Sequence, residues 1–218
     1  MLATPKPHWS GAAIVRAIGV RLPVPIAIDT DVNAAALAEN RFGAAKGCTS
    51  AVYITIGTGV GGGALVHGVP IHGMLHPEIG HLRLRRLSGD RFSGACPFHG
   101  DCIEGLISGP TLAARFARHP ATVDPTDPAW KPVVADLAEL LVAMLLAYSP
   151  QRIVMGGGVV LKQPHLLNAA IAAVPERLVG YLGDITMENL GAIIVPASLG
   201  DDAGPYGALV VAEGVARR

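Results

Sequence analysis

Two cysteines and two histidines form the group of side chains in this chain that is best suited to bind a metal. Cys96, His99 and Cys102 follow one another at intervals of three residues, and His81 lies upstream of them. A closed structural zinc site has four thiolate or imidazole ligands, and these residues supply that set. The sequence therefore predicts a zinc site at His81, Cys96, His99 and Cys102. The alternative is a pair of buried thiols beside a surface histidine.

Two carboxylates and one further thiol complete the candidates around this cluster. Asp101 and Glu104 adjoin the cysteines and are candidates to orient the metal ligands by contacting them without binding the ion. Cys48 is isolated from the cluster, so we expect it to be an ordinary thiol in the core or on the surface.

A glycine-rich segment, TIGTGVGGG, is the second candidate for chemistry. Glycine lets backbone N–H groups converge on an anion, and the Thr58 hydroxyl adds a donor. No Gly-Lys-Ser/Thr sequence follows, so the segment is not a Walker-type phosphate loop. An apolar strand follows it instead of the helix that a dinucleotide fingerprint needs. A phosphate-binding turn at Gly57, Thr58 and Gly59 and a glycine-rich hairpin without a ligand both remain open.

The third candidate is the segment Asp29-Thr30-Asp31-Val32-Asn33, where a predicted strand ends and a predicted helix begins. Asp31 is suited to cap the N-terminus of the helix. It is equally suited to act as a general base that takes a proton from a substrate hydroxyl, with Asn33 beside it to bind a sugar hydroxyl. Spacing alone does not decide between these hypotheses.

Composition excludes several classes of protein. Among 218 residues, 17 basic residues balance 17 acidic ones, so no nucleic-acid partner is expected. No apolar run approaches the roughly 20 residues of a membrane span, and MLATPKPHWSG lacks the pattern of a signal peptide. An odd count of three cysteines with metal-like spacing favours a reducing, cytoplasmic location.

Hydrophobic periodicity and turn residues predict alternating strands and helices, which indicates a mixed α/β fold. Half of the residues are hydrophobic, enough for a sizeable core. Helices are expected over 11–18, 32–41, 105–116, 132–148 and 163–182 and from 205 onward. Strands are expected over 24–28, 51–56, 64–66, 152–155 and 192–195, with glycine turns at 57–63 and 156–158 and mainly loop over 67–95.

Five motifs in this order resemble the ROK family of sugar kinases: TDVNAAALAE, YITIGTGVGGG, HPEIGH, CPFHGDCIEGLISGP and IVMGGGV. The resemblance covers nearly the whole chain and is closest to the bacterial fructokinase branch. It implies an actin-like ATPase (ribonuclease H-like) fold. Residues 1–48 would be a remnant of the N-terminal lobe, 49–200 the C-terminal lobe with the zinc loop, and 201–218 a helix that packs back on the small lobe.

The resemblance also implies a role for each candidate residue. Asp31 would be the catalytic base, and Asn33, Glu78 and His81 would lie at the sugar. The ATP phosphates and adenosine would lie at Gly57, Thr58, Gly59, Gly156, Gly157 and Gly158, with Mg²⁺ as a cofactor. Structural zinc would be held by His81, Cys96, His99 and Cys102. The histidine at position 99, where many relatives have cysteine, favours fructose as the substrate, and a homodimer is expected.

One element of the family is missing from this sequence. ROK kinases carry an Asp-x-Gly-Gly-Thr turn that forms the first phosphate loop, and no such motif occurs here. The segment MLATPKPHW resembles an internal part of the family. We therefore expect an N-terminally truncated kinase with an unpaired strand before Asp29, exposed apolar surface, and weak or absent activity in isolation.

Two other functions remain as alternatives. The first is a non-catalytic sugar-binding or dimerisation module built on the same lobe. The second is a zinc hydrolase, but its metal would need an open coordination position, and four nitrogen and sulfur ligands would close the site.

Overall fold

The computed structural model describes residues 10–216; the segment MLATPKPHW lies outside the described residues. Its helices are α1 (Ile14–Gly19), α2 (Asp31–Phe42), α3 (Ile103–Ile107), α4 (Gly109–Phe116), α5 (Trp130–Tyr148), α6 (Gly158–Leu161), α7 (Pro164–Ala172), α8 (Val174–Leu178), α9 (Met187–Ile193) and α10 (Ala203–Ala216). Its strands are β1 (Ser50–Ile56), β2 (Val60–Val66), β3 (Val69–Pro70), β4 (Arg152–Gly156) and β5 (Ile194–Pro196). Short 3₁₀ turns are η1 (Ile79–His81), η2 (Pro120–Thr122) and η3 (Gly200–Asp202).

The strands form one mixed sheet in the order β3-β2-β1-β4-β5. β1 runs antiparallel to β2 and parallel to β4, and β4 runs parallel to β5. Strands β1 and β4 therefore end at the same edge of the sheet, where β2 begins. The two predicted glycine turns follow β1 and β4, so the topology brings both of them to this edge.

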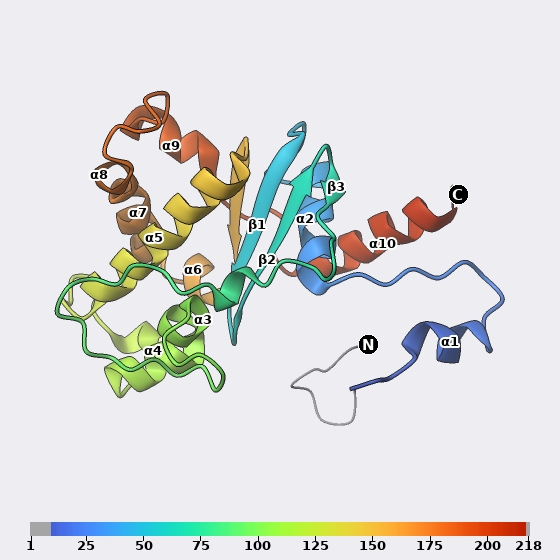
Figure 1. Cartoon of the computed structure of the whole chain (residues 1–218), viewed down its shortest axis with the longest axis horizontal. Helices are drawn as coiled ribbons and strands as arrows, with labels where there is room; N and C mark the ends of the chain where they lie inside the picture. The colour runs from blue at the N-terminus through green and yellow to red at the C-terminus, as the bar shows by residue number, and fades with distance from the viewer. Residues whose placement is uncertain (1–9, 217–218) are drawn as a thin grey trace.

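Alternating side chains of β1 face the two layers that cover the sheet. Val52, Ile54 and Ile56 belong to the larger core with α3, α4, α5 and α7, while Ala51 and Tyr53 face α2 and α10. Figure 1 shows α5 and α7 on one side of the sheet and α2 with α10 on the other. The alanines of α2 allow it to lie close to the sheet, which places its N-terminus beside β2.

The predicted strand over 24–28 is not formed, but the expectation that this segment would lack a pairing partner and expose apolar residues is confirmed. The segment is extended but pairs with no strand among the described residues, and Val24 and Ile28 are 57% and 58% exposed. Without a neighbouring strand, the β-branched residues have no ladder to join. Figure 1 shows this segment as the connection between α2 and an α1 helix that lies away from the sheet and has no buried residue.

The glycine-rich hairpin has a shorter turn than predicted. The turn is confined to residues 57–59, and residues 61–63 lie within β2. A Cβ on Gly62 would come within 2.6 Å of the Ile79 side chain, and one on Gly63 within 2.6 Å of the Val32 carbonyl oxygen. These glycines therefore allow η1 and α2 to approach the strand, and they do not shape the turn itself.

Two predicted helices are each divided in the structure. The helix over 105–116 is α3 and α4, separated at Ser108, which is extended. The helix over 163–182 is α7 and α8, with Pro175 at the start of α8 because proline has no N–H for a continuing helix. The last strand begins at Ile194, since residues 192–193 belong to α9.

Candidate active site and metal centre

The first residue of α2 is Asp31, but it does not cap the helix. Thr30 is the N-cap, and its hydroxyl accepts a hydrogen bond from Asn33 N at 3.1 Å. The Asp31 carboxylate accepts one short-range bond from Val32 N at 3.0 Å, and the residue is exposed. The hypothesis that Asp31 is an ordinary N-cap is therefore wrong, and its carboxylate is accessible at the start of the helix.

Asn33, expected at the sugar, is buried with 1% exposure. Its Nδ2 donates to Asp29 Oδ1 at 2.7 Å, while its Oδ1 is buried without a hydrogen-bond partner. In this arrangement Asn33 supports Asp29 from inside the fold.

The turn of Gly57, Thr58 and Gly59 is closed by a hydrogen bond from Gly57 N to Gly59 O at 2.9 Å. Gly57 O accepts from Gly109 N at 2.7 Å, which ties the turn to the start of α4. Thr58 is exposed at the tip of the turn. An exposed hydroxyl beside glycine N–H groups is the donor arrangement that suits a phosphate.

Glu104 connects the metal region to this turn. Its Oε2 accepts from Val60 N at 3.1 Å, and a Cβ on Gly59 would come within 2.6 Å of the same oxygen. The expectation that Glu104 orients the metal ligands is therefore wrong. The residue lies two positions after Cys102 but extends toward the glycine turn, so only a glycine fits at position 59 without displacing the carboxylate.

The second glycine turn follows β4. Gly157 has a φ of 85°, and a Cβ there would come within 2.4 Å of the Ile56 carbonyl oxygen. Gly156 is paired with Thr55 of β1, so this turn lies beside Gly57 at the end of the neighbouring parallel strand. Gly158 begins α6. The structure thus brings the six predicted nucleotide-binding residues together at one edge of the sheet.

The four predicted metal ligands converge. Their ligand atoms all lie within 4.8 Å of one another. Nδ1 of His81 is 3.6 Å from Cys102 Sγ and 3.9 Å from Cys96 Sγ, and His99 Nδ1 is 3.8 Å from Cys96 Sγ. A tetrahedral zinc ion with ordinary bond lengths would separate nitrogen and sulfur ligands by about 3.6 Å. The donor set and its spacing therefore fit a closed zinc site.

A compact backbone knuckle holds the cysteines. Cys96 and Gly100 exchange backbone hydrogen bonds of 3.1 and 2.9 Å. Burial, above all, raises the pKa of the Cys102 thiol; the Gly105 N–H partly offsets this, and Cys96 and Glu104 raise it further. A cation is what would favour the thiolate form in such a site.

The segment between the sugar candidates and the metal ligands is short. Glu78 is exposed, and its Oε1 lies 2.9 Å from His76 Nε2. His81, three residues later, directs Nδ1 at the two cysteine sulfurs. Asp101 pairs with Arg83 at 2.9 Å, so it does not orient a metal ligand as we expected.

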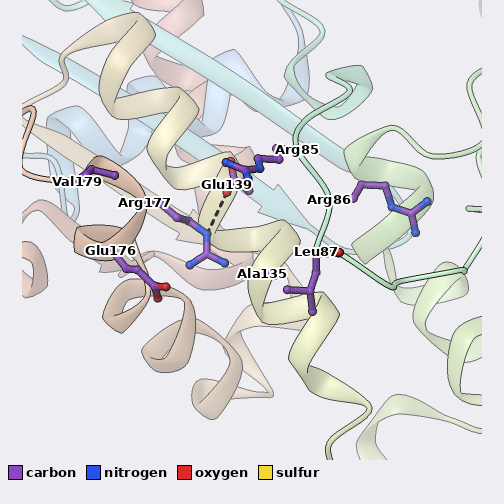
Figure 2. A pocket seen from close by; sticks show the side chains of 9 residues that line it. Arg85, Arg86, Leu87, Ala135, Glu139, Glu176, Arg177 and Val179 are labelled. Carbon is purple, nitrogen blue, oxygen red and sulfur yellow. Dashed lines mark ion pairs between the residues drawn. The ribbon is translucent and has the colours of Figure 1, made fainter.

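A separate hollow of about 480 Å³ lies between the 85–88 loop and helices α5 and α8, as Figure 2 shows. Arg177 at its wall pairs with Glu139 at 3.1 Å, and Arg86 bonds Asp90 at 2.7 Å. None of the predicted site residues lines it. Arg86 and Arg177 already have acidic partners, so this hollow is not the candidate active site.

Comparisons with known proteins identify the family of the chain. A family model described as the ROK family matches residues 1–215. The chain belongs to the ROK family. A putative fructokinase of Bacillus subtilis is 40% identical over 211 residues, 96% of this chain and 70% of the relative. A fructokinase of Zymomonas mobilis is 41% identical over 212 residues, 96% of this chain and 69% of the relative.

Solved structures confirm the predicted fold class. The ROK hexokinase of Thermus thermophilus has a TM-score of 0.75 at 30% identity, over 93% of this chain and 70% of that chain. A ROK glucokinase of Streptomyces griseus, solved with glucose and AMPPNP, has a TM-score of 0.75 at 23% identity, over 100% of this chain and 76% of that chain, and it supports the fold alone. The chain therefore has the actin-like ATPase fold of ROK sugar kinases.

Sequence reasoning assigned no role to Asp29, although it lies in the candidate segment 29–33, and it missed His72 altogether. In the structure His72 Nε2 lies 3.1 Å from Asp29 Oδ1. Within residues 10–216 no helix has the length and apolar character needed to cross a membrane.

Proposed function

We propose that this chain transfers the terminal phosphoryl group of ATP to the 6-hydroxyl of fructose, with Asp31 as the general base. The observation that carries the proposal is the Thr30 cap. Because Thr30 satisfies the N-terminal N–H of α2, the neighbouring Asp31 carboxylate is not needed for capping and faces solvent. A carboxylate held on a helix end and open to ligand can accept the proton of an attacking hydroxyl.

In this proposal the two glycine turns bind the nucleotide. The N–H groups of residues 57–59 and the Thr58 hydroxyl would donate to phosphate oxygens, and the turn at 156–158 would lie beside the adenosine. Mg²⁺ would neutralise charge on the phosphates. Hydrogen bonds from Gly109 and to Glu104 hold the first turn and its neighbour Val60 before any ligand arrives, so little rearrangement is needed on binding.

Zinc in this proposal is structural. Four nitrogen and sulfur ligands leave no open coordination position, so the residues His81, Cys96, His99 and Cys102 would hold the ion without exposing it to substrate. Their role is to fix the segment that carries Glu78. Loss of the ion should therefore weaken sugar binding.

The choice of fructose rests on the relatives. Those named fructokinase are 34–41% identical to this chain. A glucokinase of Streptomyces coelicolor is 32% identical over 56% of this chain. The expected homodimer, the cytoplasmic location and the division into lobes stay predictions from the sequence.

A coupled assay for ADP release with Mg-ATP and fructose tests the proposal. Asp31→Asn keeps the size of the side chain but removes the base, so kcat should fall about 10²- to 10⁴-fold, with both KM values changed little. Glu188→Gln, which removes an exposed carboxylate elsewhere, is the matched control and should retain activity. Fructose binding without ADP release in the unmodified chain would instead support the non-catalytic sugar-binding module.

A further inference from the structure

A histidine that the proposed function leaves unused lies against the N-terminal turn of α2. His72 follows β3, and its Nε2 is 3.1 Å from Asp29 Oδ1. The Asp29 side chain is 13% exposed, whereas the His72 side chain is 51% exposed. The pair therefore has a shielded carboxylate and an imidazole that a ligand can reach.

The hydrogen bonds around Asp29 determine the state of the His72 ring. Asp29 Oδ1 also accepts from Thr30 N and from Asn33 Nδ2, both at 2.7 Å. A carboxylate only accepts, so His72 Nε2 carries a proton and donates. Asn33 Nδ2, 3.4 Å from the same ring nitrogen, is then a second donor and does not accept that proton. In the neutral ring, Nδ1 is left as an acceptor.

The support behind the ring is rigid. Asn33 is buried, and its amide cannot be turned around without pointing its oxygen at the Asp29 carboxylate. Thr30 bonds both Asp29 and Asn33 within the same turn. Asp29 is thus fixed by its neighbours and in turn fixes the orientation of His72.

Strand β2 shows where this ring lies relative to the rest of the site. Three contacts follow β2 in order along the strand: Asn33 lies against Gly63, Ile79 lies against Gly62, and Gly80 lies against Val60. The segment from Ile71, which bonds Ala64, to Gly80 therefore runs back along β2 toward the phosphate turn. His72 lies near the Gly63 end, about 13 Å from Gly59 at about 3.3 Å per strand residue. A hexose is shorter than this, so the sugar and the transferring phosphate together would fill the distance.

We propose that His72 is a specificity-determining residue that accepts a hydrogen bond from a sugar hydroxyl remote from the phosphoryl-accepting one. This rests on the proposed function. Sugar hydroxyls donate as well as accept, and the Asp31 and Glu78 carboxylates proposed at the sugar are acceptors, so a third acceptor at the far end fits a polyhydroxylated ligand. Asp29 is the positioning residue that holds His72 in the accepting tautomer.

The test measures fructose affinity in four versions of the chain. His72→Ala removes the acceptor, whereas His72→Gln can donate to Asp29 and still accept with its amide oxygen. His67→Asn, in the turn before β3, changes a second histidine of the same hairpin; asparagine tolerates its left-handed backbone, with φ of 53°. Fructose binding is measured by calorimetry in the presence of AMPPNP, and initial rates are measured with Mg-ATP and fructose.

We expect His72→Ala to raise the Kd and KM for fructose about 10- to 100-fold, with the KM for ATP changed less than about two-fold. His72→Gln should restore most of the affinity, and His67→Asn should match the unmodified chain. The deoxyfructose that lacks the hydroxyl bonded to His72 should bind the unmodified chain about 10-fold more weakly than fructose does. The same deoxyfructose should bind His72→Ala no more weakly than fructose binds that variant.

Four results separate failure of this proposal from failure of the proposed function. Unchanged fructose affinity in His72→Ala, with normal turnover in the unmodified chain, removes the role of His72 alone. Equal losses for fructose and ATP with a lowered Tm show a purely structural contact. If the unmodified chain binds fructose but does not release ADP, the kinase proposal fails while the affinity series still decides the role of His72. If it does not bind fructose at all, both proposals fall.

Discussion

Two groups of side chains hold the loop between His81 and Cys96, and they differ in how visible they are in the sequence. At the ends of the loop are the four candidate metal ligands, whose ligand atoms cluster. In its middle Asp90 Oδ2 accepts from Arg86 at 2.7 Å and from Arg115 of α4 at 2.9 Å. Arg115 also lies 3.6 Å from Asp136 of α5.

The difference lies in what each group does with its charge. The proposed metal centre gathers thiols that a cation would make anionic, so its charge balance would depend on an ion from solution. The second group, which we term the arginine–aspartate network, balances positive and negative side chains inside the fold. It consists of Arg86, Asp90, Arg115 and Asp136. Burial alone would raise the pKa of Asp90, but hydrogen bonds from Arg86 and Phe92 N and the nearby Arg115 together lower it. Burial raises the pKa of Asp136 to about 6, although Arg115 opposes the rise.

The largest effect is expected from breaking the metal centre. Cys102→Ser removes a buried ligand, so bound zinc should be lost and fructose-dependent turnover should fall at least about 10²-fold, because the segment that carries Glu78 is released. Metal analysis and rates measured on the same sample check this. Cys48→Ser, outside the cluster, is the control and should keep both, and a Cys102→Ser variant that keeps its zinc would contradict the ligand set.

Breaking the network should cost stability while the metal is retained. Asp90→Asn leaves the guanidinium of Arg115, only 6% exposed, without its closest carboxylate. Removing one member of a buried ion pair typically costs about 3 kcal/mol or more. Urea unfolding measures the loss, and zinc content should stay unchanged. A variant that loses its zinc would mean that the two groups are not independent.

Asp136 makes the stability of the network depend on pH. With a folded pKa of about 6 and an ordinary pKa of 3.8, the folded chain binds this proton more tightly than the unfolded chain does. The free energy of unfolding should therefore fall by up to about 3 kcal/mol as the pH rises from about 4 to 6. Above pH 6 it should stay at this lower value.

Asp136→Asn tests this sign directly. The variant should lack that fall and should be more stable than the unmodified chain at pH 8, by about 1–2 kcal/mol. Unfolding curves at pH 5 and pH 8 provide the measurement. Lower stability of the variant at pH 8 would show that the charged Asp136 is favourable beside Arg115.

The smallest effect is expected from an exposed pair beside the metal centre. Arg83, 67% exposed, bonds Asp101 at 2.9 Å. Arg83→Ala should change the free energy of unfolding by less than about 0.5 kcal/mol, because solvent screens an exposed pair. Thermal unfolding at low and high salt checks this value. A loss comparable to that of Asp90→Asn would show that burial is not what separates the two groups.

Much of the site followed from local patterns. The metal ligands converge as their spacing predicted, and both glycine turns lie at the ends of β1 and β4. The prediction of a strand over 24–28 was wrong because β-branched residues form a strand only where a neighbouring strand is available to pair with. The helix boundaries at Ser108 and Pro175 depended on contacts and on proline chemistry that periodicity does not register.

The sequence by itself determined the donor set for a metal, the glycine turns and the alternation of strands and helices. These signals reside in residue types at short spacing, so no distant contact is needed to recognise them. Only the tertiary structure decided that Thr30 caps α2, that Glu104 reaches Val60, that Asp29 holds His72, and that Asp90 joins Arg86 to Arg115. The physical reason is that hydrogen bonds and ion pairs form between common polar residues, whose partners are chosen by which segments pack together.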